Sequence, residues 1–205
     1  MNDIESIPLL SIRVLKTSLY IDNEALLKEI KSHSRDIDTQ FVVDEYSTHY
    51  TYYEDKAYPF GHKESDNFIK VIEDKVSSAL NKKMKVTDIW SLTLEKGQSI
   101  SAHSHKLNTH LHPEEYYSIS YYAQAEEDSA DLIFMLAACN TLETNVPIKV
   151  KTGDLLIFNS YLMHMTNRHT GTKERIVISA NLVPEVPTMS VAQDWTVHSV
   201  SRNSE

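Results

Sequence analysis

Residues 153–182 read GDLLIFNSYLMHMTNRHTGTKERIVISANL, and they give the clearest indication of the fold. The apolar run at 155–158 is typical of a buried strand, and strict alternation follows from residue 175. Successive side chains of an extended strand face opposite sides of the sheet. We therefore expect one strand face to carry Arg175, Val177, Ser179 and Asn181, and the other Ile176, Ile178, Ala180 and Leu182.

Between these two runs lies His164, eleven residues before Arg175. One interpretation is a metal-ligand histidine and an anion-binding arginine that face one small cavity. The other is a surface strand whose arginine is solvated. This stretch alone leaves both interpretations open.

Upstream of this stretch, the chain from residue 86 consists of short apolar or alternating runs separated by polar loops. We expect eight strands, at 86–95, 98–105, 116–123, 131–137, 147–151, 154–159, 162–166 and 174–183. No helical pattern interrupts them. Such a series favours a double-stranded β-helix core of the jelly-roll, cupin-like type.

The N-terminal part of the chain adds two helices to this core. A strand is expected at 9–20, a helix capped by Asp22-Asn23 and ending near residue 34, a strand at 41–53, and a helix capped by Ser65-Asp66. Both helices are amphipathic, so each should pack one face on a sheet. The expected class is mainly β with flanking helices, the two N-terminal helices packing outside the core.

We expect a single domain over residues 1–205. Residues 1–85 supply the N-terminal strands and helices that pack on the barrel, 86–185 form the core, and 186–205 form a tail. With 205 residues, such a domain can bury most of its apolar surface without disulfides.

Composition excludes several classes of function. The net charge of −9 argues against nucleic acid as a partner, because binding to a phosphate backbone relies on clustered Lys and Arg. We see no signal peptide, and no apolar run approaches the length of a membrane helix. The single cysteine, Cys139, fits a reducing, cytoplasmic compartment.

Four of the ten histidines lie between residues 103 and 112. If 98–105 is extended, His103 and His105 share a face, and a third histidine from elsewhere would complete a facial set for iron, zinc, copper or nickel. His110, His112 and Glu114 form a second candidate set, of the type with histidines and one carboxylate. Solvated histidines at a strand end would give the same pattern without a metal.

A wider pattern resembles the iron(II)/2-oxoglutarate-dependent oxygenase family. It comprises Trp90, Gly97, His103-x-His105, Ser118-x-Ser120-Tyr-Tyr, Gly153-Asp154-x-x-x-Phe158, His164, Arg175 and Asn181. The resemblance covers roughly residues 88–183. It implies the double-stranded β-helix fold, iron(II) as cofactor, and 2-oxoglutarate and O2 as co-substrates.

Carried over residue by residue, the resemblance implies that His103, His105 and His164 hold the iron and that no further side chain is catalytic. Arg175 would bind the distal carboxylate of 2-oxoglutarate, with Ser179 and Tyr121 as further co-substrate contacts. Either Tyr121 or its neighbour Tyr122 would line the pocket. The chain departs from the common pattern in four places. No His-x-Asp occurs in it, the His-x-His-Pro motif is split between the pairs at 103/105 and 110/112, Ser118-Ile119-Ser120 replaces Ser-Gly-Val, and Val177 stands where a serine is often found.

The leading hypothesis is thus a dioxygenase that hydroxylates an unidentified small-molecule or protein substrate. A cupin-like metal enzyme that does not use 2-oxoglutarate is one alternative, and a non-enzymatic jelly-roll binding module is another. Substrate specificity is expected in residues 36–66, 106–115 and 138–147, and the loop at 106–115 could act as a lid. The sequence also leaves open whether the protein forms an oligomer.

Overall fold

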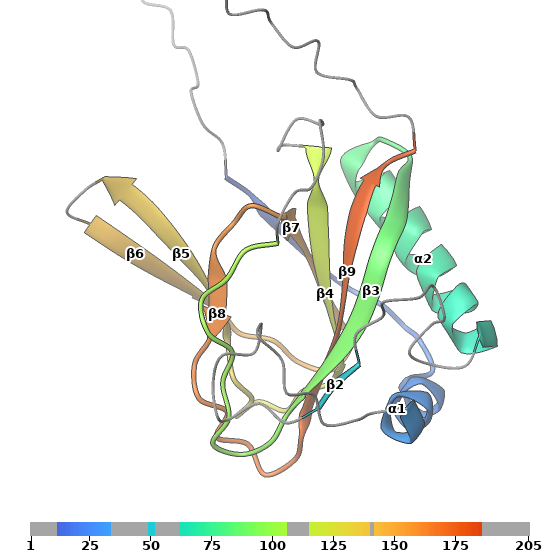
Figure 1. Cartoon of the computed structure of the whole chain (residues 1–205), viewed down its shortest axis with the longest axis horizontal. Coiled ribbons are helices and arrows are strands. Elements are labelled where there is room, and N and C mark those ends of the chain that lie inside the picture. Colours follow the sequence, from blue (N-terminus) through green and yellow to red (C-terminus); the bar gives the residue numbers. More distant parts are fainter. Residues whose placement is uncertain (1–11, 34–48, 52–61, 106–114, 140–141, 186–205) are drawn as a thin grey trace, which may run out of the picture.

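The computed structural model describes residues 12–33, 49–51, 62–105, 115–139 and 142–185. Figure 1 shows two antiparallel sheets, with two helices on the outer side of the larger sheet. The helices are α1 (Asn23–His33) and α2 (His62–Leu80). The mainly β class with flanking helices, predicted from the sequence, is confirmed.

The larger sheet has six strands in the order β1-β7-β4-β9-β3-β2. They are β1 (Val14–Ser18), β2 (His49–Thr51), β3 (Met84–Leu94), β4 (Tyr117–Gln124), β7 (Asp154–Asn159) and β9 (Arg175–Pro184). Every neighbouring pair is antiparallel. Because one face packs on the helices and the other on the smaller sheet, β7 is buried on both sides, which explains its unbroken apolar run.

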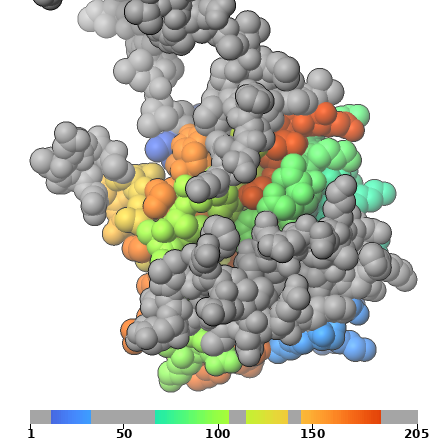
Figure 2. All heavy atoms as spheres, in the orientation of Figure 1, coloured from blue at the N-terminus to red at the C-terminus, as the bar shows by residue number. Residues whose placement is uncertain are grey.

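The smaller sheet has the order β6-β5-β8 and comprises β5 (Leu132–Cys139), β6 (Leu142–Ile148) and β8 (His164–Thr166). In Figure 2, β5 and β6 (yellow) lie on the opposite side of the molecule from α1 and α2 (blue and teal). The strand predicted at 147–151 was misplaced, since β6 ends at Ile148. Its Pro147 is tolerated because β6 is an edge strand.

Two apolar layers hold these elements together. The outer layer lies between the helices and the larger sheet, and it includes Ile176, Ile178, Ala180 and Leu182 of β9. The inner layer lies between the two sheets and includes Val177. The predicted alternation along β9 is therefore confirmed, and its Arg175 face looks into the space between the sheets.

A β-bulge in β3 changes which residues face inward. Val86 pairs with Leu182, but the next pair is Asp88 with Asn181, so Thr87 is an extra residue. Before the bulge Met84 and Val86 contact the outer layer, and after it Ile89 does so. The bulge thus turns Asp88 toward the inner face, where strict alternation from Val86 would have pointed it at the helices.

The predicted strand at 98–105 does not form as a regular strand. This segment runs antiparallel to residues 160–169, and its main-chain hydrogen bonds include those between His103 and His164, of 2.9 and 2.8 Å, and one from His105 N–H to Ser160 O of 2.9 Å. Strand-like pairing is confined to the single bridge between His103 and His164. The prediction was wrong because these bonds are too irregularly spaced for a continuous ladder.

The local signals for α1 were correct. Asp22 accepts hydrogen bonds through Oδ1 from the N–H groups of Glu24 and Ala25, at 3.1 and 3.3 Å, as an N-cap does. Helix α2 begins at His62, earlier than the expected cap at Ser65-Asp66. Of the strand predicted at 41–53, the structure describes β2 at 49–51, and the remainder lies outside the described residues. None of the helices described is long and apolar enough to cross a membrane.

Candidate metal centre

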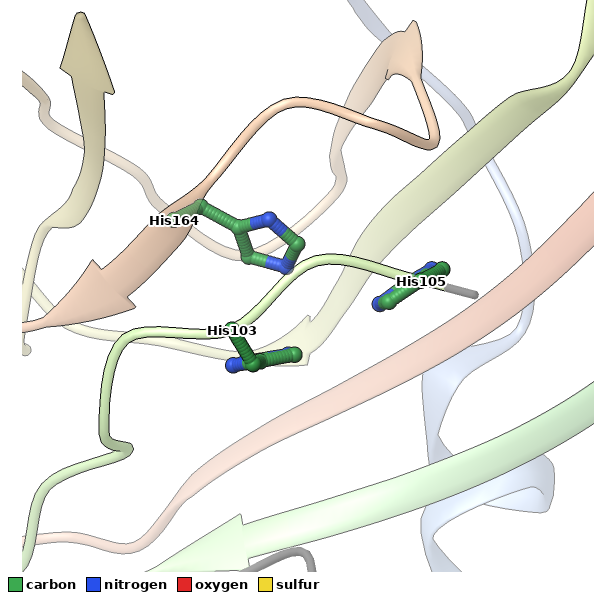
Figure 3. Close-up of side chains that lie close together, drawn as sticks. All are labelled: His103, His105 and His164. Atoms are coloured by element: carbon green, nitrogen blue, oxygen red, sulfur yellow. The ribbon is translucent and has the colours of Figure 1, made fainter. Parts of the chain in front are cut away.

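Three histidines converge in the space between the sheets. His103 and His105 come from the segment that follows β3, and His164 begins β8 (Figure 3). Each ring offers a nitrogen to the cluster, and these three atoms lie within 4.8 Å of one another. The sequence prediction grouped these same three side chains. The alternative set, His110, His112 and Glu114, lies outside the described residues and stays untested.

Main-chain carbonyls orient two of the three rings. Nδ1 of His103 lies 2.8 Å from the carbonyl oxygen of Ser101, and Nδ1 of His164 lies 2.8 Å from that of Leu162. A carbonyl oxygen only accepts hydrogen bonds, so each Nδ1 must carry the proton and donate it. The Nε2 lone pair of each ring is then free for a metal.

His105 is oriented by side chains instead. Its Nδ1 lies 2.7 Å from Ser118 Oγ and 2.7 Å from Asn181 Oδ1. Asn181 in turn donates from Nδ2 to Asp88 Oδ1 over 2.7 Å. Asp88, Asn181 and Ser118 stand in one row across three adjacent strands, because Asn181 pairs with both of the others in the sheet.

The electrostatic environment keeps the cluster uncharged. Burial, with smaller contributions from the neighbouring His103 and His105, lowers the pKa of His164 to about 3. Burial also lowers the pKa of His105 to about 4, against the opposing effect of its hydrogen bond to Asn181. Burial likewise lowers the pKa of His103. Neutral imidazoles are the form that binds metals, so the donor set fits a divalent ion such as iron(II).

Arg175 is buried, with 1% of its surface exposed. Its Nε donates to Ala130 O over 3.0 Å, and its Nη2 lies 3.4 Å from the hydroxyl of Tyr122. Its Nη1 has no hydrogen-bond partner among the described residues, and no carboxylate there forms a salt bridge with it. A buried guanidinium with an unpaired N–H is costly on its own, and it suits a carboxylate ligand.

The two other predicted co-substrate residues lie on different faces. Ser179 lies on the same face of β9 as Arg175, and it pairs with Ser120 of β4 and Trp90 of β3. Tyr121, by contrast, belongs to the outer layer, where its hydroxyl donates to Asn23 Oδ1 over 2.7 Å. It therefore points away from the space between the sheets. Its neighbour Tyr122 faces inward and contacts Arg175.

The position of His169 in the polar loop after His164 predicts a solvent-facing side chain, but this prediction is wrong because the residue is buried. Its Nδ1 accepts a hydrogen bond from Ala130 N–H at 3.2 Å, so its Nε2 carries the proton and donates to Lys173 O at 2.8 Å. Both ring nitrogens are thus engaged, which separates this histidine from the cluster. Gly171 makes the tight turn possible, because a Cβ there would lie 2.6 Å from His169 Cε1.

Replacing His169 with phenylalanine should destabilise the fold without removing a metal ligand. The change leaves the buried N–H of Ala130 and the carbonyl of Lys173 without their partner, at a cost of about 1–3 kcal/mol for each group. We expect a melting temperature lower by several degrees and a smaller drop for His169→Asn, which keeps an acceptor. Equal melting temperatures for wild type and His169→Phe would contradict this account.

Sequence reasoning missed Asp88 and did not decide between two neighbouring tyrosines. Asp88 was missed, although the spacing of the outward apolar residues Met84, Val86 and Ile89 breaks the period of two and thereby marks the bulge. The sequence left open whether Tyr121 or Tyr122 lines the pocket, and of the two only Tyr122 faces inward. The face of β4 could have been set by the alternation of Ser118 and Ser120 with Ile119.

Comparison with known proteins agrees with this geometry. Residues 88–181 match the family described as "Putative 2OG-Fe(II) oxygenase". This range contains all three clustered histidines, together with Arg175, Asp88 and Asn181. A comparison with curated protein sequences found no match.

Solved structures share the fold at low sequence identity. A prolyl-4-hydroxylase from Pseudomonas putida is 11% identical, with 86% of this chain and 95% of that chain covered and a TM-score of 0.58. The non-haem α-ketoglutarate-dependent epimerase SnoN of nogalamycin biosynthesis is 10% identical, with coverages of 88% and 83% and a TM-score of 0.67.

A third structure, HygX from Streptomyces hygroscopicus with nickel and 2-oxoglutarate bound, is 14% identical. It covers 87% of this chain and 85% of that chain, with a TM-score of 0.60. These likenesses confirm the double-stranded β-helix. They agree with the family match, which spans residues 88–181 and so a little less than half of the chain, and with the three converging histidines.

Proposed function

We propose that the chain is an iron(II)/2-oxoglutarate-dependent oxygenase, in which His103, His105 and His164 hold the iron(II) and Arg175 binds the distal carboxylate of 2-oxoglutarate. The observation that carries the proposal is the buried Nη1 of Arg175, which lacks a partner in the described part of the chain. Arg175 lies on the same strand face as Asn181, the residue that contacts His105. One face of β9 therefore carries both Arg175 and the residue that contacts the histidine cluster.

The co-substrate contacts follow from that strand face. Val177 carries no hydroxyl and packs in the inner apolar layer, so it cannot replace the serine often found two residues after the arginine. We assign the second contact to Tyr122, whose hydroxyl already lies beside Arg175. Ser179 and Ser120 line the next row of the sheet toward Asn181, and Ser179 keeps its expected role as a further contact.

Two phenylalanine rings lie beside the centre. Phe158 and Phe134 lie with their ring centroids 5.1 and 6.0 Å from that of His164. When bound, iron(II) supplies the redox chemistry that couples oxidative decarboxylation of 2-oxoglutarate to oxidation of a substrate. The protein would position the neutral imidazoles and neutralise the co-substrate carboxylate. The substrate itself stays open, as does the oligomeric state.

Anaerobic titration with iron(II), followed by 2-oxoglutarate, tests the proposal. The family resemblance leads us to expect stoichiometric metal binding and then a weak visible charge-transfer band. 2-Oxoglutarate at about 100 times its Kd should stabilise the metal-loaded protein by about 2.7 kcal/mol. Glutarate, which lacks the 2-oxo group but keeps both carboxylates at the same chain length, should not produce the band.

The outcomes separate the three hypotheses. Metal binding without a band or a thermal shift would favour a cupin-like metal enzyme that does not use 2-oxoglutarate. The absence of stoichiometric metal would favour a non-enzymatic jelly-roll module. Only the combination of metal, band and thermal shift agrees with the oxygenase and with the residue roles proposed above.

A further inference from the structure

We propose that Asp88, acting through Asn181, fixes the tautomer of His105 and thereby makes its Nε2 available to the metal. Asp88 and Asn181 are thus positioning residues. The inference deepens the proposed function, because it rests on His105 as a metal ligand. In the family that the sequence resembles, a carboxylate ligand is common at the position of His105. A histidine there needs neighbouring residues that fix which ring nitrogen carries the proton.

His105 differs from the other two histidines in how its proton is placed. The carbonyl oxygens of Ser101 and Leu162 can only accept, so they hold the rings of His103 and His164 in the Nδ1–H form. The partners of His105 are a hydroxyl and a side-chain amide. Either can reverse its role, since a hydroxyl both donates and accepts, and an amide can rotate to exchange its oxygen and nitrogen.

A carboxylate removes that ambiguity. Asp88 Oδ1 accepts from Asn181 Nδ2 over 2.7 Å, and Asp88 Oδ2 accepts from Thr87 Oγ1 over 2.8 Å. Burial raises the pKa of Asp88, but these two donors oppose that shift and favour the ionised form. An ionised carboxylate only accepts, so the amide nitrogen of Asn181 must face it and the amide oxygen must face His105. Nδ1 of His105 must then carry the proton, and Nε2 keeps its lone pair.

Strand pairing places the residues of this hydrogen-bond chain side by side in the sheet. The bulge at Thr87 brings Asp88 onto the inner face, directly opposite Asn181. Ser118 pairs with Asn181 from the other side, and its hydroxyl also lies 2.7 Å from Ser160 Oγ. Without the bulge the carboxylate would point toward the helices and could not accept the hydrogen bond from Asn181 Nδ2.

Long-range ¹H–¹⁵N spectra of the imidazole rings test the inference in the metal-free protein, because they show which ring nitrogen carries the proton. Wild-type His105 should be in the Nδ1–H form. Asp88→Asn permits both orientations of Asn181, so a mixture of tautomers is expected. Mn(II) affinity, measured by calorimetry, should fall about 10–100-fold, as for other residues that orient metal ligands.

A swap of the two residues gives the sharpest comparison. In Asp88→Asn/Asn181→Asp the carboxylate accepts from His105 directly, and the amide donates to that carboxylate, so the hydrogen bonds run in the original direction. The double variant should restore the Nδ1–H form and most of the Mn(II) affinity. Asp74→Asn, the same chemical change on an exposed residue of α2, should alter neither.

A wild-type His105 protonated at Nε2 would overturn the inference, whether or not the protein binds metal. An unchanged tautomer in Asp88→Asn would also overturn it, while leaving the proposed iron site intact. Failure of the wild-type protein to bind Mn(II) or iron(II) would instead contradict the proposed function. The tautomer spectra would still decide whether Asp88 orients His105.

Discussion

Replacing Arg175 with methionine should abolish the response to 2-oxoglutarate while leaving the metal-free fold at least as stable as wild type. Methionine retains the volume of the aliphatic stem and removes a buried charge whose Nη1 is unpaired in the described structure. Substituting an apolar group for a buried charge is often neutral or stabilising. The wild-type arginine is thus expected to cost stability until a carboxylate pairs with it.

The loss of affinity should be large, because truncating one partner of a buried, hydrogen-bonded charge pair costs about 2–5 kcal/mol. That corresponds to a weakening of about 30-fold to several thousand-fold. Differential scanning fluorimetry of the Mn(II)-loaded protein, with and without 2-oxoglutarate, measures the effect. A wild-type gain of about 2.7 kcal/mol at 100 times Kd should vanish in the variant.

Arg13→Met is the matched control, since Arg13 is exposed and precedes β1. It should keep the full response to 2-oxoglutarate. If Arg175→Met instead binds 2-oxoglutarate as tightly as wild type, Arg175 does not clamp the carboxylate. Its burial beside Tyr122 would then need another explanation.

Replacing His164 with alanine should abolish stoichiometric metal binding. The substitution removes one of three converging nitrogens, so the loss should exceed the 10–100-fold effect typical of residues that merely orient a ligand, at about 100-fold or more. His103→Ala and His105→Ala should behave alike. Calorimetry with Mn(II), and anaerobic calorimetry with iron(II), measure the change.

Two controls make this result specific. In His169→Gln the substituted histidine is buried but lies outside the cluster. This variant should retain one metal per chain, even with a lower melting temperature. The double variant His110→Ala/His112→Ala tests the alternative ligand pair. Loss of metal in that double variant, with retention in His103→Ala, would move the centre to the other pair and contradict the assignment of His103 and His105.

Local pattern was enough to predict most elements of the fold. Alternation along 175–182 determined which side chains of β9 face inward, because the period of an extended strand is fixed by backbone geometry. The carboxylate of Asp22 and the apolar spacing after it located α1. The segment at 98–105 was wrongly predicted as a strand. Whether it forms a regular ladder depends on its pairing with residues 160–169, which the local sequence does not reveal.

The sequence by itself determined the alternation along β9 and the inward position of Arg175, since both depend on residue type and on a short-range period. The grouping of His103 and His105 with His164 came from the family resemblance, and the sequence left His110, His112 and Glu114 open as an alternative set. Only the tertiary structure decided which histidines share a centre with Asp88 and which are structural, as His169 is. Those distinctions depend on hydrogen bonds between residues far apart in the chain, such as Asn181 with Asp88 and with His105. The bulge at Thr87 places Asp88 on the inner face of the sheet. The pairing of β3 with β9 then places Asp88 opposite Asn181.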